Sequence, residues 1–146
     1  MGIHDISRTE LDKANRLPRF NMPFELGLFL GARTFGSGDQ KKKACLILDR
    51  DRYRYQKFLS DIAGQDIASH DDKIERLIDA VRNFLNSHSP GRPLPASSLI
   101  QKDYERFRAL LPELSKAAEL DPGNLEYIDF AWLASDYVSE DTGKPL

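Results

Sequence analysis

Glu25 is the residue of this chain whose surroundings point most directly to chemistry. It lies in the run NMPFELG, residues 21–27, and further apolar residues follow it. A carboxylate among apolar side chains is energetically unfavourable unless it is paired or used in a reaction. The other interpretation is structural, because an acidic residue in the first turn of a helix interacts favourably with the helix dipole. Position alone leaves both interpretations open.

The run around Glu25 is predicted to begin a helix. Asn21 can cap a helix that starts near Met22 and Pro23, because asparagine accepts hydrogen bonds from exposed amides and proline suits a first turn. This helix is expected to reach residues 31–33. Apolar residues occupy almost every side of it, namely Phe24, Leu26, Leu28, Phe29 and Leu30. Such a pattern is typical of a helix buried between a sheet and other helices.

Short apolar segments on either side of this helix predict a parallel sheet. Residues 2–6, GIHDI, resemble the end of a strand, and residues 44–48, ACLIL, form the continuous apolar run of a strand covered on both faces. We expect these two strands to be adjacent and parallel, with the helix as their crossover. Residues 66–68 are a candidate edge strand. So thin a sheet predicts that a strand and a helix precede this chain, or that self-association completes it.

The second half of the chain is predicted to be helical. Apolar residues at 74, 77, 78, 81 and 85 share one face of an amphipathic helix capped by Asp71 or Asp72. A proline-containing linker, residues 89–97, then separates an α/β core, residues 1–88, from C-terminal helices, residues 98–146. We expect those helices at about 98–120, with Pro112 inside, and at 125–138, packed on the same domain.

The arrangement of Asp5 at a strand end, followed by a loop and the sequence around Glu25, resembles two related families. They are the nucleoside 2-deoxyribosyltransferase-like proteins and the bacterial TIR-like predicted nucleotide-binding proteins. The string Phe24-Glu25-Leu26-Gly27 is similar to the one with which they present a glutamate at the start of a helix. The resemblance covers residues 2–50 and implies an α/β, flavodoxin-like parallel sheet that lacks its N-terminal strand and helix.

This resemblance implies a nucleotide-binding domain that takes NAD, another nucleotide or a nucleoside as substrate or ligand, without a resident cofactor. It further implies cleavage or exchange of an N-glycosidic bond, with Glu25 as nucleophile or as counter-charge to the developing oxocarbenium ion. Asp5, Ser7, Arg8 and Asn21 would orient the ribose or the phosphate, at the edge where open α/β sheets bind ligands.

Two alternatives from other classes of function stay open. One is a nucleotide-sensing or self-associating module without catalysis. The other is a structural interaction domain whose C-terminal helix pair docks a partner. Residues 52–58, RYRYQKF, leave a similar choice, because interleaved basic and aromatic residues either stack on a nucleotide or pack while their charges stay solvated.

Composition narrows the class of protein. The 146 residues are 40% hydrophobic and 30% charged, which is typical of a globular domain, and 21 basic residues are balanced by 23 acidic ones. Without a basic excess, duplex nucleic acid is not an expected partner. No apolar stretch approaches the roughly 18 to 20 residues that span a membrane, and residues 1–10 lack the apolar core of a secretory signal. A single cysteine, Cys45, fits a cytoplasmic location and a small buried hydrophobe.

The histidines do not predict a metal site. His4 adjoins Asp5, but alternation along a strand sends neighbouring side chains to opposite faces. His70 precedes two aspartates at a helix start, and no second histidine or cysteine stands at ligand spacing, so helix capping is the favoured interpretation. His88 is expected to complement the dipole at a helix end.

Overall fold

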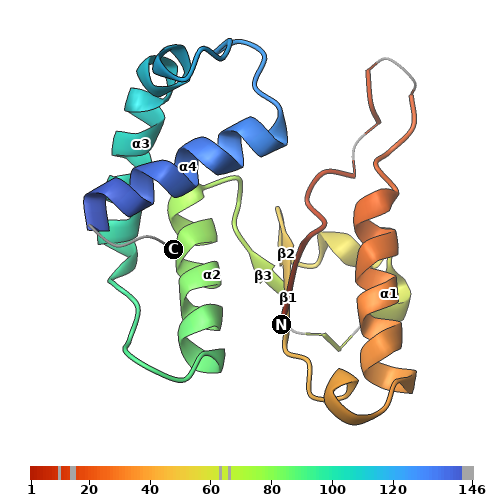
Figure 1. Ribbon diagram of the computed structural model, residues 1–146. Coiled ribbons are helices and arrows are strands. Elements are labelled where there is room, and N and C mark those ends of the chain that lie inside the picture. Colours follow the sequence, from red (N-terminus) through yellow and green to blue (C-terminus); the bar gives the residue numbers. More distant parts are fainter. Residues whose placement is uncertain (10, 14–15, 63, 66, 143–146) are drawn as a thin grey trace. The chain divides into compact units, whose positions relative to one another are not determined.

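The computed structural model describes residues 1–9, 11–13, 16–62, 64–65 and 67–142, and for residues 141–142 the backbone alone. The chain divides into two compact units, an N-terminal unit, Met1–Ser97, and a C-terminal unit, Ser98–Leu146. The elements are β1 (Gly2–Asp5), α1 (Asn21–Phe35), β2 (Cys45–Asp49), β3 (Ile67–Ser69), α2 (Ile74–His88), α3 (Ser97–Ala117) and α4 (Tyr127–Thr142) (Figure 1). Three short 3-10 helices complete the described part, η1 (Gly38–Gln40), η2 (Arg54–Lys57) and η3 (Ser60–Ile62).

The N-terminal unit is built on a three-stranded parallel sheet with the order β1-β2-β3. Ile3 lies opposite Leu46, and Ile47 lies opposite Ile67, so β2 is the central strand. The predictions of an α/β class, of two adjacent parallel strands and of a third strand at the edge are confirmed. The apolar run of β2 is explained by its place, because a central parallel strand is covered on both faces.

Alternate residues of β2 face opposite layers of the N-terminal unit. Ile47 packs with Ile6 and Leu26 in a cluster that includes α1, whereas Leu48 packs with Phe84 in a cluster formed with α2. Helix α1 therefore covers one face of the sheet and α2 covers the other (Figure 1). This period of two is what a pleated strand imposes on a core.

Helix α1 differs from its prediction in two respects. The helix was expected to be buried on nearly every side, and this is wrong, because only Leu26 is buried while Phe24 and Leu28 are exposed. A three-stranded sheet covers one side of α1, and no other described element of the N-terminal unit covers the outer side. Capping by Asn21 is also wrong, since Asn21 is the first helical residue, Phe20 is the N-cap, and no side chain caps the helix. Glu25 consequently lies beyond the first turn.

The start of α2 also corrects an expectation. Neither Asp71 nor Asp72 caps the helix, since the N-cap is Lys73 and no side-chain hydrogen bond caps the helix there. Both aspartates have left-handed backbones, with φ of 52° and 54°. Aspartate tolerates this region better than most residues. The turn that results directs the chain from the end of β3 into α2.

The C-terminal unit packs α3 against α4 around Phe107, Leu111 and Leu133. Pro112 lies inside α3, as predicted. The helix ends in a Schellman motif, in which the Leu120 amide donates to the Ser115 carbonyl at 2.8 Å and Glu119 has a left-handed φ of 58°. Packing of this unit on the α/β core stays a prediction. Within the described residues, no helix combines the length and apolarity that a membrane crossing requires.

Candidate functional site

The carboxyl ends of all three strands meet at one edge of the sheet. β1 ends at Asp5, β2 at Asp49 and β3 at Ser69, and the register places Asp49 opposite Ser69. Each strand is followed by polar residues. Open α/β sheets bind ligands at this edge, so its side chains are the candidates for a site.

A polar hollow of about 210 Å³ opens at this edge. Its lining comes from the segment after β1 and from the segment that leads from β3 into α2: Asp5, Ser7, Arg8, His70, Asp72, Lys73, Ile74 and Leu77. The hollow thus combines carboxylates, cations, a hydroxyl and an imidazole above two apolar residues of α2. Three of the predicted ligand-binding residues, Asp5, Ser7 and Arg8, are together in it.

His70 is a buried polar residue of the hollow, with 7% of its surface exposed. Its Nδ1 accepts a hydrogen bond from the Asp72 amide at 3.2 Å, which assigns the proton of the neutral ring to Nε2. Nε2 lies 3.8 Å from Oδ1 of Asp5 and has no hydrogen-bond partner. The prediction that His70 caps α2 is wrong, because the ring bonds an amide that precedes the helix. A buried donor without a partner can serve a ligand.

Asp5 is held in place beside His70. Its Oδ1 accepts a hydrogen bond from the Ser7 amide at 2.9 Å, which turns the chain directly after β1. Ser7 is itself buried, whereas Arg8 and Lys73 are exposed at the rim. At 3.8 Å the His70 Nε2 and the Asp5 Oδ1 lie beyond direct hydrogen-bond distance, so a ligand hydroxyl between them would accept from the one and donate to the other. The first amides of α2 add the partial positive charge of a helix N-terminus.

Arg54 fixes the segment after β1 to the end of β2. Its guanidinium donates to Oδ1 of Asp49 at 2.9 Å from Nε, and to the same oxygen from a terminal nitrogen. It also donates to the Thr9 hydroxyl at 2.7 Å and to the carbonyls of Ile6 and Ser7 at 2.9 and 2.8 Å. Asp49 is fully buried. One arginine therefore shapes the wall of the hollow without lining it.

Sequence reasoning missed this ion pair. Residues 52–58 were weighed only as a stacking surface or a solvated segment, whereas Arg54 and the buried Tyr55 both serve the core. The available signal was Asp49, a carboxylate that closes an entirely apolar strand and requires a cation nearby.

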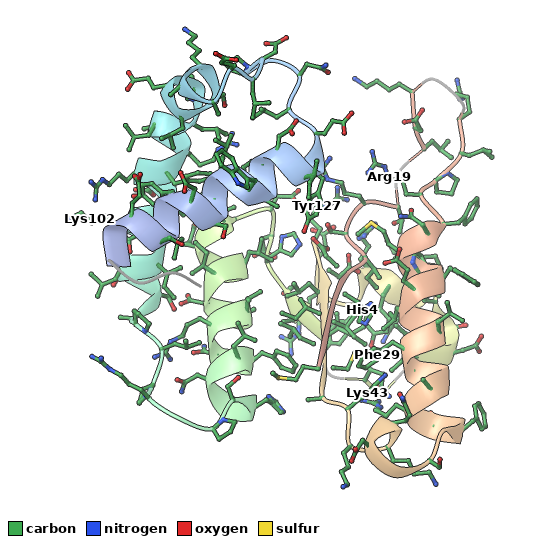
Figure 2. All side chains as sticks on the ribbon, in the orientation of Figure 1. His4, Arg19, Phe29, Lys43, Lys102 and Tyr127 are labelled. Atoms are coloured by element: carbon green, nitrogen blue, oxygen red, sulfur yellow. The ribbon has the colours of Figure 1, made fainter. Side chains whose placement is uncertain are left out.

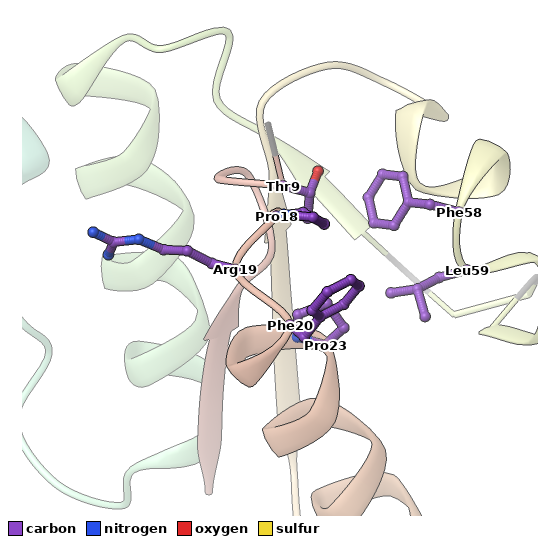
Figure 3. Close-up of a pocket in the computed structure, with 7 residues that line it drawn as sticks. All are labelled: Thr9, Pro18, Arg19, Phe20, Pro23, Phe58 and Leu59. Atoms are coloured by element: carbon purple, nitrogen blue, oxygen red, sulfur yellow. The ribbon is translucent and has the colours of Figure 1, made fainter. Parts of the chain in front are cut away.

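An apolar slot of about 250 Å³ lies on the other side of the same segment (Figure 3). It is lined by Thr9, Pro18, Arg19, Phe20, Pro23, Phe58 and Leu59. The rings of Phe20 and Phe58 are both accessible, and the Arg19 side chain points away (Figure 3). The Arg54 guanidinium lies 5.1 Å from the centre of the Phe58 ring. Because Arg8 lines the polar hollow and Thr9 lines the slot, the two spaces are neighbours along the segment after β1.

The structure does not bring Glu25 or Asn21 into either of these spaces. Glu25 is exposed on α1, and its negative charge acts on the pKa of His4. Burial lowers the pKa of His4, and the charge of Glu25 partly opposes that shift. The His4 ring contacts Phe29 of α1 at 4.9 Å between centroids (Figure 2). The predicted site residues are thus divided between the α1 side of β1 and the polar hollow.

Among the described residues, neither a candidate metal cluster nor the cysteine lies at this edge. The described residues include no group of three or more histidines, cysteines, aspartates or glutamates positioned to hold a metal ion. Cys45 is a half-buried free thiol at the other end of β2. Burial raises the pKa of Cys45, and Arg33 partly opposes that shift, so the unreactive thiol form is favoured.

Comparisons with protein-family models, with curated proteins and with solved structures found no match. The resemblance of Phe24–Gly27 to the TIR-like and deoxyribosyltransferase-like families stays a prediction. What this chain binds has to be inferred from the residues at the carboxyl edge of its sheet.

Proposed function

We propose that the N-terminal unit binds a nucleotide, with the phosphate in the polar hollow and the base in the apolar slot. One observation carries the proposal: consecutive residues at the carboxyl edge of a parallel sheet line two spaces, Ser7 and Arg8 the charged hollow and Thr9 the aromatic-lined slot. A nucleotide has the same division into a charged end and a flat apolar end.

The polar hollow suits the phosphate and the ribose. Arg8 and Lys73 supply cations at its rim, and the α2 N-terminus supplies amides, a combination that favours phosphate oxygens. The Nε2–H of His70 is a further donor that has no hydrogen-bond partner among the described residues. Asp5 and Asp72 are acceptors for ribose hydroxyls and disfavour a second anion, so a monophosphate fits this charge pattern best.

The apolar slot suits the base. Stacking of a base on an aromatic side chain contributes about 1–3 kcal/mol, and Phe20 and Phe58 both offer a ring. The Thr9 hydroxyl accepts a hydrogen bond from Arg54, which leaves its own proton free to donate to a ring nitrogen or carbonyl.

The finer fold and the chemistry are proposals of the same kind. The order β1, α1, β2 and a parallel edge strand supports a flavodoxin-like, TIR-like fold. Binding without catalysis requires only the hollow and the slot. Cleavage of an N-glycosidic bond additionally requires Glu25 to reach the sugar, and Glu25 lies on α1 near His4. Nucleotide binding is therefore the function that the site supports best.

Titration calorimetry with AMP, adenosine and ribose 5-phosphate tests this assignment. Arg8→Met should weaken AMP at least tenfold, because a charge-assisted hydrogen bond contributes about 1.5–3 kcal/mol, and should leave adenosine unchanged. Phe58→Ala should weaken AMP and adenosine alike. Arg52→Met, a change of an exposed arginine outside both spaces, is the matched control. Failure of AMP to bind at millimolar concentration, or equal binding by all variants, would refute the proposal.

A further inference from the structure

The outer side of α1 is an uncharged apolar face that the described residues of the N-terminal unit leave uncovered. Phe24, Leu28 and Phe35 are 65%, 59% and 88% exposed. They border a shallow groove together with Gly27, Gly31, Ala32 and Gly36. Contiguous apolar surface of this size on a soluble domain usually marks an interaction site.

The two helical glycines in the groove have no role in the fold of the chain itself. A Cβ atom added to Gly27 or to Gly31 would meet no other atom within 4 Å. Each glycine lowers the stability of a helix interior by about 1 kcal/mol relative to alanine. Their effect is to leave a notch beside the ridge of Phe24, Leu28 and Phe35, so that another backbone can approach closely.

We propose that this face is a homodimer interface, in which α1 packs against α1 of a second copy. A two-fold interface must be complementary to itself. The groove residues are uncharged, so two copies meet without like-charge repulsion, and the ridge of each fits the glycine notch of the other. With the ridge and the notch on one helix, the face meets this requirement of self-complementarity.

The exposed area of the ridge gives the surface that such a dimer would bury. With about 200 Å² for a full aromatic side chain, the three ridge residues expose on the order of 400 Å² per chain. Together with the groove between them, two copies bury about 1,000 Å², the lower limit for a specific interface. An interface at this lower limit is expected to be reversible rather than permanent. This inference does not depend on nucleotide binding.

Sedimentation of the full chain, at concentrations that span roughly two orders of magnitude around the micromolar range, tests the interface. The wild type should shift from monomer to dimer. Gly31→Gln fills the notch with a helix-favouring polar side chain and should raise the dissociation constant at least tenfold while the fold is kept. Ile128→Gln changes an exposed apolar residue of α4 and should leave it unaltered.

Cross-linking locates the contact independently. In a Cys45→Ala background, Leu28→Cys should give a disulfide-linked dimer under mild oxidation, whereas Asp39→Cys, at an exposed position outside the groove, should not. A wild type that stays monomeric at every concentration would overturn the proposal. A dimer that Gly31→Gln leaves intact, or that Leu28→Cys fails to cross-link, would also overturn it, because the interface would then lie elsewhere, for example at the β1 edge.

Discussion

Replacement of Arg54 by methionine tests how the carboxyl edge of the sheet is held together. The arginine side chain is 13% exposed and its partner Asp49 is 0% exposed, so the pair is desolvated. Arg54→Met removes five hydrogen bonds and leaves the Asp49 carboxylate buried with one partner, the Arg50 amide at 2.7 Å. Breaking such a pair destabilises by about 3–5 kcal/mol, a large share of the roughly 5–15 kcal/mol of a whole domain.

Amide hydrogen exchange followed by NMR measures this loss of stability in the N-terminal unit, separately from the C-terminal unit. The Ile6 amide, which donates to the Leu48 carbonyl at 2.9 Å, reports opening between β1 and β2. Its protection should fall by at least a hundredfold in Arg54→Met. Arg52→Met, at an exposed position, should change the free energy of opening by about 0.5 kcal/mol or less.

A second change separates the lost ion pair from lost packing. Adding Asp49→Asn to Arg54→Met removes the uncompensated charge, so the double variant should be more stable than Arg54→Met alone. Arg54→Lys keeps the charge without the planar fork and should lie between wild type and Arg54→Met. A loss below about 1 kcal/mol in Arg54→Met, or a double variant as unstable as the sum of both changes, would refute the reasoning.

Three further predictions concern other parts of the chain. Since burial lowers the pKa of His4, the unfolded state binds its proton first, so stability should fall as pH drops below about 6.5 and the fall should diminish in His4→Leu, measured by urea unfolding. Glu25→Gln should lower the pKa of His4 further in an NMR titration, and it should abolish any release of base from NAD or nucleosides if Glu25 is catalytic. Glu119→Gly should stabilise the C-terminal unit by about 0.5–1 kcal/mol, because glycine suits the left-handed position, whereas Glu113→Gly inside α3 should destabilise it, both followed by Trp132 fluorescence during thermal unfolding.

The elements that sequence predicted well are those whose pattern is set by local geometry. The run at 44–48 predicted a strand covered on both faces because it is apolar at every position, and β2 is such a strand. The apolar period from 74 to 85 predicted α2 because one face of that helix packs on the sheet. Both signals depend on residues close together in the chain.

Helix α1 was mispredicted because composition does not reveal what covers a helix. An apolar surface all round indicates burial only if a layer exists on each side, and the described residues of the N-terminal unit supply a layer on one side alone. The capping errors have a related cause. A polar residue before a helix caps it only if its backbone is extended, whereas Asp71 and Asp72 are left-handed and Asn21 is already helical.

The predicted site residues are divided because side chains alternate between the two faces of β1. Adjacent strand residues face opposite sides, so His4 lies toward α1, where Glu25 influences it, and Asp5 lies toward His70 and the polar hollow. Asp5 and Glu25 could act on one ligand only if that ligand passed around the end of β1. The segment after β1 that Arg54 fixes lies at this end of the strand, and its Thr9 lines the apolar slot. Such a ligand would have to pass along this segment. Binding in the polar hollow and chemistry at Glu25 are therefore separable properties of this chain, and Glu25→Gln should leave AMP affinity unchanged whether or not it abolishes base release.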